Sequence, residues 1–205
     1  MIVLIPARGG SKSIPRKNLV QLAGRPLISY AIRAGLASTE VSQVVVSTED
    51  AEIAELATKL GAAVLSRDPE LASDSTTMIG VLMNAMRFSS ENEALVLVQP
   101  TNPFVRAEHI NNCASVLANE PQWNSVQTVA AVMHNDHYIN QRAIKESGAV
   151  DFILPEAHAA TPLKQQKPPA FRFGGCVAMR VGAMRQQVSC FPQPSQPILI
   201  DPQLQ

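Results

Sequence analysis

Short, almost uniformly apolar runs alternate along the chain with longer stretches in which apolar residues recur at helical spacing. The apolar runs predict strands at residues 2–5, 44–47, 63–65, 95–98 and 126–132. The helical spacing predicts helices at residues 27–36, 51–60, 76–88 and 107–118. Strands without polar alternation are typical of a sheet buried on both faces. The alternation therefore predicts an α/β fold with a mostly parallel sheet covered by helices on both faces.

This rhythm fails at about residues 133–169, where we expect an excursion from the core that serves as an oligomerisation arm. The pattern resumes with a returning strand at residues 171–181, a short helix at 182–188 and a proline-punctuated tail from residue 191. No internal repeat divides the sequence, so residues 1–205 are expected to form a single domain with this arm. The pattern ends without a closing element, and a shortened C-terminus is one interpretation.

Composition excludes several classes of partner. The 205 residues include 17 Lys or Arg and 17 Asp or Glu, which leaves no formal net charge, and the few aromatic residues are not interleaved with basic ones. We therefore expect no nucleic-acid partner. No apolar run approaches the roughly 18 residues that span a bilayer, and residues 1–6 lack the features of an export signal. Three cysteines at irregular spacing are typical of reduced thiols, which predicts a cytoplasmic protein with no membrane partner.

Basic residues gather in two segments that contain no acid. The segment before Glu40 holds Arg8, Lys12, Arg16, Lys17, Arg25 and Arg33. The segment at residues 157–200 holds Lys164, Lys167, Arg172, Arg180 and Arg185. A fold that brings both segments to one cleft would favour an anionic ligand there.

The first basic segment includes a glycine-rich loop that directly follows the first predicted strand. In an open parallel sheet, ligands bind at the carboxyl ends of the strands. Gly9 and Gly10 allow close backbone approach, and Arg8, Lys12 and Lys17 can neutralise several phosphate oxygens. The spacing matches neither the P-loop nor the dinucleotide fingerprint, which weakens ATPase and dehydrogenase readings. The loop therefore predicts a polyphosphate site of another kind.

From this loop onward the sequence resembles the cytidylyltransferases that activate sialic acid and related acidic sugars. The motifs that carry the resemblance occur in the family's order and cover almost the whole chain. They are IPARGGSK at 5–12, PRKNL at 15–19, GRPL at 24–27, VSTED at 46–50, RDPELASD at 67–74, QPTNP at 99–103, QQ at 165–166, and AFR at 170–172 with Gly175.

The resemblance implies a Rossmann-like nucleotidyltransferase fold and a homodimer in which the arm of one subunit helps to close the site of the other. It also implies that CTP reacts with a 2-keto-3-deoxy acid sugar, with Mg²⁺, to give a CMP-sugar and pyrophosphate. The sugar's anomeric hydroxyl would displace pyrophosphate at the α-phosphate. Catalysis would then depend mostly on positioning and charge neutralisation.

Roles for individual residues follow from the resemblance alone. It implies that Arg8 and Lys17 are catalytic and hold the CTP phosphates. The other nucleotide-binding residues that it implies are Ala7, Gly9, Ser11, Asn18, Arg67, Ser75, Thr76 and Thr77, the last four resembling the family's cytosine pocket. The substrate-binding residues that it implies are Gln99, Gln165 and Arg172, where a guanidinium suits a sugar carboxylate.

The sequence departs from the family at the metal site. The family's Asp-x-Asp pair is matched by Leu199, Ile200 and Asp201, so the second carboxylate is kept and the first is replaced by leucine. Mg²⁺ needs one or two carboxylates beside the substrate phosphates. Asp201 could suffice as the metal ligand with CTP and water, Asp74 could contribute, or catalysis could be lost.

Two alternatives to transfer onto a nonulosonate remain open on the sequence. Where sialic acid enzymes commonly have Asn-Gly and then Tyr, this chain has Gly174-Gly175 and Ala178, so the polar and the aromatic residue are replaced at Gly174 and Ala178. This departure would permit another small acid as the acceptor of CMP, such as 3-deoxy-manno-octulosonate or a phosphonate. If catalysis is lost, the chain would instead be a CTP-binding regulatory protein.

Overall fold

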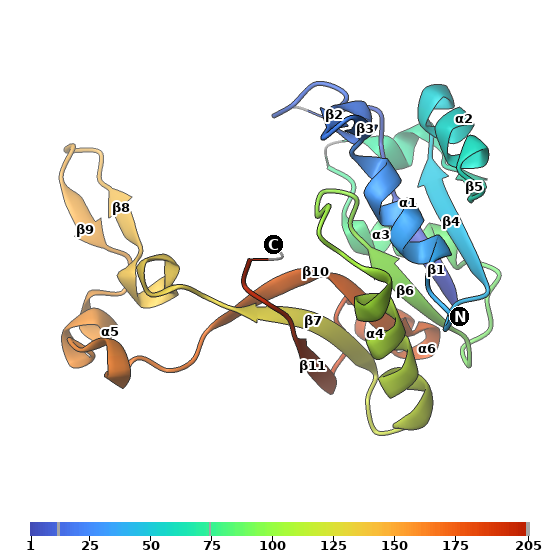
Figure 1. Ribbon diagram of the computed structural model, residues 1–205. Coiled ribbons are helices and arrows are strands. Elements are labelled where there is room, and N and C mark those ends of the chain that lie inside the picture. Colours follow the sequence, from blue (N-terminus) through green and yellow to red (C-terminus); the bar gives the residue numbers. More distant parts are fainter. Residues whose placement is uncertain (12, 74, 204–205) are drawn as a thin grey trace.

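The computed structural model describes residues 1–11, 13–73 and 75–203 and is shown in Figure 1. The strands are β1 (Ile2–Pro6), β2 (Gln21–Leu22), β3 (Arg25–Pro26), β4 (Gln43–Thr48), β5 (Ala63–Ser66), β6 (Ala94–Val98), β7 (Ser125–Ala131), β8 (Arg142–Ile144), β9 (Val150–Phe152), β10 (Phe171–Arg180) and β11 (Ser195–Leu199). The α-helices are α1 (Ile28–Leu36), α2 (Ala51–Lys59), α3 (Met78–Ala85), α4 (Ala107–Asn119), α5 (Pro155–Ala160) and α6 (Val181–Gln187). Short 3₁₀ helices are η1 (Lys17–Leu19), η2 (Pro69–Ala72), η3 (His134–Asp136), η4 (Tyr138–Asn140) and η5 (Lys164–Gln166).

The main sheet of the described residues has seven strands in the order β11-β7-β10-β6-β1-β4-β5. β1 pairs in parallel with β4 and β6, β4 with β5, and β7 with β11, whereas β10 is antiparallel to both of its neighbours. From β1 the chain proceeds to β4 and β5 on one side and then crosses to β6 on the other. The prediction of a mostly parallel sheet is confirmed, and the switch in direction beside β1 marks the usual ligand crevice of such sheets.

Both faces of the sheet are buried, which explains why its strands read as uniformly apolar. In β1, Val3 and Ile5 pack under α1, α2 and α4, whereas Leu4 packs under α3 and α6. All three side chains have no exposed surface. Burying a side chain of this size stabilises a fold by about 1.5–3 kcal/mol, so β1 is a rigid base for the loop that follows it.

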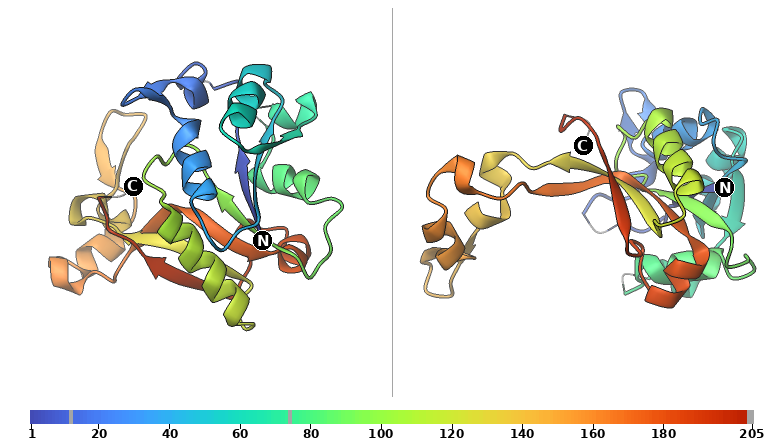
Figure 2. Two further views of the ribbon diagram at one scale, coloured as in Figure 1. Left: turned by 45° about the vertical axis from the view of Figure 1, so that its right-hand side comes forward. Right: turned by 90° about the horizontal axis from the view of Figure 1, so that it is seen from below.

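Residues 132–170 leave the body between β7 and β10 and project clear of it as an arm (Figures 1 and 2). The arm carries the β8–β9 hairpin and α5. Within it, Arg142 lies over the ring of Phe152 with 4.4 Å to the ring centre, and Lys145 forms an ion pair with Asp151. The arm is therefore held together by contacts near its surface rather than by a core of its own.

The tail from residue 191 differs from its prediction, because residues 195–199 form the edge strand β11. Proline lacks the N–H that a central strand must donate, so Pro197 in the sequence argues against a strand. At a sheet edge one row of N–H groups has no neighbouring strand, and proline is tolerated there. No helix of the described residues is long and apolar enough to cross a membrane.

Candidate active site

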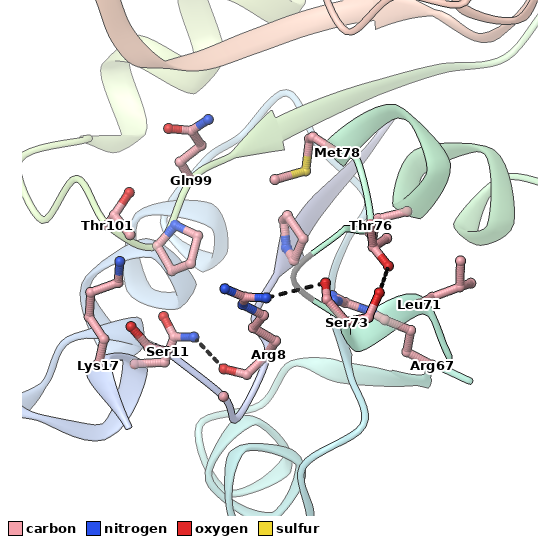
Figure 3. Close-up of a pocket in the computed structure, with 15 residues that line it drawn as sticks. Arg8, Ser11, Lys17, Arg67, Leu71, Ser73, Thr76, Met78, Gln99 and Thr101 are labelled. Carbon is pink, nitrogen blue, oxygen red and sulfur yellow. Dashed lines mark hydrogen bonds between the residues drawn. The ribbon is translucent and has the colours of Figure 1, made fainter. Parts of the chain in front are cut away.

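A cleft of about 310 Å³ opens at the carboxyl ends of β1 and β6, where the strand order reverses. Arg8 comes from the loop after β1, Arg67 from the end of β5 and Gln99 from the end of β6 (Figure 3). The described residues that line the cleft are Pro6, Arg8, Gly10, Ser11, Lys17, Asn18, Arg67, Leu71, Ser73, Thr76, Met78, Val81, Gln99, Pro100 and Thr101. None of these is acidic and three are cationic, so the cleft favours an anionic ligand.

Arg8 and Lys17, the two predicted catalytic residues, both line this cleft. Arg8 stands in the middle of the site, where its guanidinium donates to the carbonyl of Ser73 at 3.3 Å (Figure 3). Lys17 begins η1 and approaches from the side opposite Ser73. Two cations that face one cavity from different positions can contact different oxygens of one polyphosphate.

Asn18 follows Lys17 in η1 and is buried, and its Nδ2 donates to the carbonyl oxygen of Arg8 at 2.9 Å. The amide is thereby used within the protein, on the backbone of the residue that enters the cleft. Ser11 also lines the cleft, whereas Lys12, which was expected to add a further positive charge, lies outside the described residues. The Asn18 side chain therefore holds the backbone of the loop that carries Arg8.

Arg67 is buried against the end of β4. Its guanidinium donates to the carbonyl of Ser47 at 2.5 Å and its Nε to the Ser47 hydroxyl at 3.3 Å. Burial lowers the pKa of Arg67, the nearby carboxylate of Glu49 raises it, and the positive charge of Arg8 lowers it. An arginine held by a backbone carbonyl forms a fixed wall of the cleft rather than a mobile one.

Ser73 and Thr76 form the wall opposite Lys17. The Ser73 hydroxyl lies 3.0 Å from that of Ser75 and 2.9 Å from that of Thr76, and Ser73 and Thr76 line the cleft. Thr77 caps α3 by accepting from the amide of Gly80 at 3.3 Å. The helix therefore begins at Met78 rather than at residue 76, and Thr76 lies outside the helix, where it lines the cleft.

Ala7 and Gly9 belong to the loop but do not line the cleft. The amide of Ala7 donates to the carbonyl of Ser47 at 2.9 Å, and that of Gly9 donates to Oε1 of Glu49 at 2.7 Å. A Cβ on Gly9 would overlap the carboxylate of Asp50, so only glycine fits there. Both amides therefore join the loop to β4 and to the residues that follow it.

The three predicted sugar-binding residues are not brought together within this chain. Gln99 lines the cleft, and its backbone amide donates to the carbonyl oxygen of Gly175 at 3.0 Å. Gln165 is exposed on the arm in η5, and Arg172 is exposed near the start of β10 opposite Ala130. The side chains of Gln165 and Arg172 lie on the arm side of the molecule, outside the described lining of the cleft.

The expectation that both basic segments meet in one cleft is wrong for Arg180 and Arg185. Arg180 donates to the carbonyl oxygens of Trp123 and Leu117 at 2.9 and 2.8 Å. Arg185 donates to those of Met86 and Ser89 at 2.5 and 2.9 Å. These arginines satisfy backbone carbonyl groups in the last turn of α4 and in the segments that follow α4 and α3, and so they are structural.

The position of Ala178 also differs from its expectation as a sugar-pocket residue. Ala178 is fully buried in the core of the sheet that α4 covers, so its small size concerns packing. A Cβ on Gly174 would lie 2.7 Å from both the hydroxyl of Thr128 and a methyl of Ile200. The departures at these two positions therefore reflect core geometry.

Asp201, the predicted metal ligand, follows β11 and lies in a second cavity with Leu199 and Glu108. Its Oδ1 accepts from the amide of Gln203 at 2.9 Å, which is an ordinary aspartate turn. The described part of the chain contains no group of three or more His, Cys, Asp or Glu that could hold a metal. Asp74 lies outside the described residues. The described residues therefore offer no preformed metal site of three protein ligands, and Asp201 as a ligand of Mg²⁺ stays a prediction.

Several residues that line the cleft were absent from the predicted site. They are Pro6, Gly10, Leu71, Ser73, Met78, Val81, Pro100 and Thr101. Most belong to or border the motifs at 5–12, 67–74 and 99–103, and each motif follows a strand, which is a signal the sequence does contain. Met78 and Val81 carried no such signal, since they read as core positions of a helix and line the cleft only because α3 begins beside the strand ends.

Comparison with known proteins agrees with this architecture. A curated relative, the CMP-N,N'-diacetyllegionaminic acid synthase of Legionella pneumophila, is 28% identical over 98% of this chain and 87% of its own length. The N-acylneuraminate cytidylyltransferase of Escherichia coli is 33% identical over 63% of this chain, which spans 31% of that enzyme. The solved structure of a CMP:2-keto-3-deoxy-manno-octonic acid synthetase complexed with CTP superposes over 98% of this chain and 89% of its own, with TM-score 0.71 and 16% identity, which shows a shared fold.

The family match itself covers most of the chain. Residues 2–160 match the family model described as cytidylyltransferase, and this range contains β1, β4, β5 and β6 together with every described residue that lines the cleft. The cleft thus coincides with the part of the sequence that defines the family, and the chain belongs to the cytidylyltransferases.

Proposed function

We propose that this protein transfers CMP from CTP to the anomeric hydroxyl of a nonulosonate, such as sialic acid or a relative like legionaminate, and releases pyrophosphate. The observation that carries this proposal is the cationic cleft at the strand switch point, with Arg8 in the middle of it and Lys17 at one side. The relatives named as legionaminic acid and acylneuraminate enzymes support the choice of sugar.

The reaction makes a bond between the anomeric oxygen and the α-phosphorus of CTP and breaks the bond from that phosphorus to the bridging oxygen of pyrophosphate. The proton of the anomeric hydroxyl is released to solvent. Negative charge grows on the leaving pyrophosphate, where Arg8 and Lys17 can neutralise it. Because the described lining is free of acids, nothing in it opposes the growing charge.

The nucleoside end of CTP is assigned to the side of the cleft formed by Arg67, Ser73 and Thr76. Arg67 is fixed by Ser47, and the hydroxyls of Ser73 and Thr76 are joined to one another, so this wall is preorganised. Apolar Leu71, Met78 and Val81 complete the lining of the cleft and suit the faces of a pyrimidine ring.

Magnesium enters the proposal as the cation that accompanies CTP, and its chemistry would be to neutralise the phosphate charge further. Asp201 as a protein ligand of this cation stays a prediction. One carboxylate that already accepts a hydrogen bond within a turn would bind the cation weakly without the phosphates of CTP. In the chain's own contribution, charge neutralisation falls to Arg8 and Lys17.

The sugar carboxylate is assigned to the guanidinium of Arg172, with Gln165 as a neutral contact, and both would come from the partner subunit of a homodimer. The arm exposes several large apolar side chains, which supports this assembly because a second subunit would bury them. The free state of Cys113, Cys176 and Cys190 is consistent with the expected cytoplasmic location, which stays a prediction.

The test is pyrophosphate release from CTP and Mg²⁺ with N-acetylneuraminate, legionaminate and 3-deoxy-manno-octulosonate, each beside an assay without sugar. We expect sugar-dependent release that is fastest with a nonulosonate. Faster release with 3-deoxy-manno-octulosonate would move the substrate to another small acid. Tight CTP binding without release for any sugar would replace the proposal with a CTP-binding regulatory protein.

A further inference from the structure

Arg8 can act on a phosphate only if its backbone is held in one orientation. The peptide group between Arg8 and Gly9 has two polar atoms, and side chains from other segments hold both. The carbonyl oxygen of Arg8 accepts from Nδ2 of Asn18 at 2.9 Å, and the amide of Gly9 donates to Oε1 of Glu49 at 2.7 Å. The plane of this peptide is therefore fixed from two sides, which fixes the direction in which the Arg8 side chain leaves the chain.

The contact with Glu49 lies behind the loop, away from the ligand. Gly10 and Ser11 line the cleft, whereas Gly9 and Glu49 do not. Glu49 directly follows β4 and precedes the N-cap of α2, so its backbone is attached to the core of the sheet. The carboxylate thus transmits the position of β4 to the loop without touching the substrate.

A second contact holds the same loop further along. Asp50 caps α2 by accepting from the amides of Glu52 and Ile53 at 3.0 Å, and its two oxygens lie 3.1 Å from the guanidinium of Arg16. Arg16 has a left-handed backbone with φ of 51°, which is uncommon outside glycine and is maintained by surrounding contacts. The Arg16 contact therefore helps to fix the far end of the loop.

Electrostatics supports a role for Glu49 beyond its hydrogen bond. The positive charge of Arg8 lowers the pKa of Arg67, while the Glu49 carboxylate raises the pKa of Arg67. A carboxylate placed behind the loop offsets part of the repulsion between the two cations before an anionic ligand arrives.

We propose that Glu49 is a positioning residue of the transferase: its carboxylate holds the Gly9 amide and thereby aims Arg8 into the cleft at the CTP phosphates. The proposal rests on the proposed function for the identity of the ligand. It predicts that Glu49 acts through Arg8, that the acceptor oxygen is what matters, and that a neutral acceptor of the same shape retains most of the effect.

The test is a double-mutant cycle on CTP binding, measured by titration calorimetry with the full chain. Glu49→Ala should weaken CTP binding about tenfold, the equivalent of about 1.4 kcal/mol. In an Arg8→Ala background the same substitution should change CTP affinity less than about twofold, because the group that Glu49 positions is gone. Glu55→Ala, which removes an exposed acid of the neighbouring helix, should leave affinity within about twofold.

Glu49→Gln separates the hydrogen bond from the charge, since glutamine keeps an oxygen acceptor. We expect it to bind CTP within about threefold of the parent and to keep the Gly9 amide protected from hydrogen exchange, while Glu49→Ala exposes it. Equal effects of Glu49→Ala with and without Arg8, or a glutamine variant as weak as the alanine variant, would overturn the proposal. An unfolded Glu49→Ala protein, judged by its melt, would shift the decision to the glutamine variant and its exchange rate.

The two proposals can fail separately. If the parent binds CTP but transfers CMP to no sugar, the proposed function fails and the cycle still decides the role of Glu49. If the parent is active and Glu49→Ala binds CTP with parental affinity, the positioning role fails and the function stands.

Discussion

The cleft and the arm are built on opposite plans. The cleft places polar and cationic side chains on a base with no exposed surface, since Val3, Leu4 and Ile5 are fully buried below it. The arm exposes apolar side chains, with Ile144, Val150, Ile153 and Leu163 each more than half accessible, over a segment whose buried side chains are His137 and Ile139. The comparison teaches that the cleft stands on a rigid base within one chain, whereas the arm leaves large apolar side chains that this chain does not cover.

The largest effect is expected where the core beneath the cleft is broken. Ile53→Asp places an unpaired charge at a position that is 1% exposed, and we expect the protein to lose cooperative folding. Ile144→Asp, at 78% exposure on the arm, should leave the melting temperature of the body unchanged. Circular dichroism melts of the two variants measure this. A cooperative melt for Ile53→Asp would show that the core under α2 is misplaced.

The second effect is on activity without an effect on folding. Arg8→Ala should lower kcat/KM for CTP by roughly 10²–10³, because a charge-bearing donor to the leaving group is lost, and Lys17→Ala should behave similarly. Arg87→Ala, a surface arginine stacked on Phe88 at 4.8 Å, is the matched control and should stay near parental activity. The measurement is the steady-state rate of pyrophosphate release. Turnover of Arg8→Ala at the parental rate would exclude Arg8 from the catalytic role.

The third prediction tests whether the arm completes the cleft of a second copy. Arg172→Ala should raise KM for the sugar about tenfold and leave that for CTP within about twofold, since Arg172 lies outside the cleft. Mixing equal amounts of inactive Arg8→Ala and weakened Arg172→Ala chains should restore about a quarter of the parental sites, because half of the dimers are mixed and each has one intact site. Activity that only averages those of the two variants would place Arg172 and Arg8 in one subunit's site or none.

The smallest effect concerns the pH dependence of the free energy of unfolding. His109 is buried at the start of α4, where Nδ1 accepts from the amide of Arg106 at 3.3 Å, and burial lowers its pKa. Below about pH 6.5, His109 binds a proton in the unfolded chain, whereas the buried His109 of the native protein stays neutral. The free energy of unfolding therefore falls as the pH falls. The loss of stability ends at the pH where the native histidine also binds its proton.

Urea unfolding at pH 7.5, 6.5 and 5.5 measures this dependence. His109→Gln keeps an acceptor for the Arg106 amide and should reduce the loss of stability between pH 6.5 and 5.5. The same slope with and without His109 would assign the pH dependence to other groups.

Periodicity was enough for the strands of the main sheet other than β11. Uniformly apolar strands such as β1 and β6 can be buried only between two layers of helices, so the pattern itself predicts the doubly covered sheet. The prediction of Arg8 and Lys17 in one cleft succeeded because both are close in sequence to the end of β1, where local connectivity leaves few arrangements.

The sequence by itself determined the positions of most strands and helices, the glycine-rich loop and the family, because these depend on local spacing. Only the tertiary structure decided that Arg180 and Arg185 serve backbone carbonyls, that Pro197 lies in an edge strand, and that Glu49 meets Gly9 across 40 residues. The physical reason is that such contacts depend on which strand ends become neighbours in the folded sheet. Which strand ends are adjacent depends on how the whole chain packs, and the local sequence around each residue contains no pattern that predicts it.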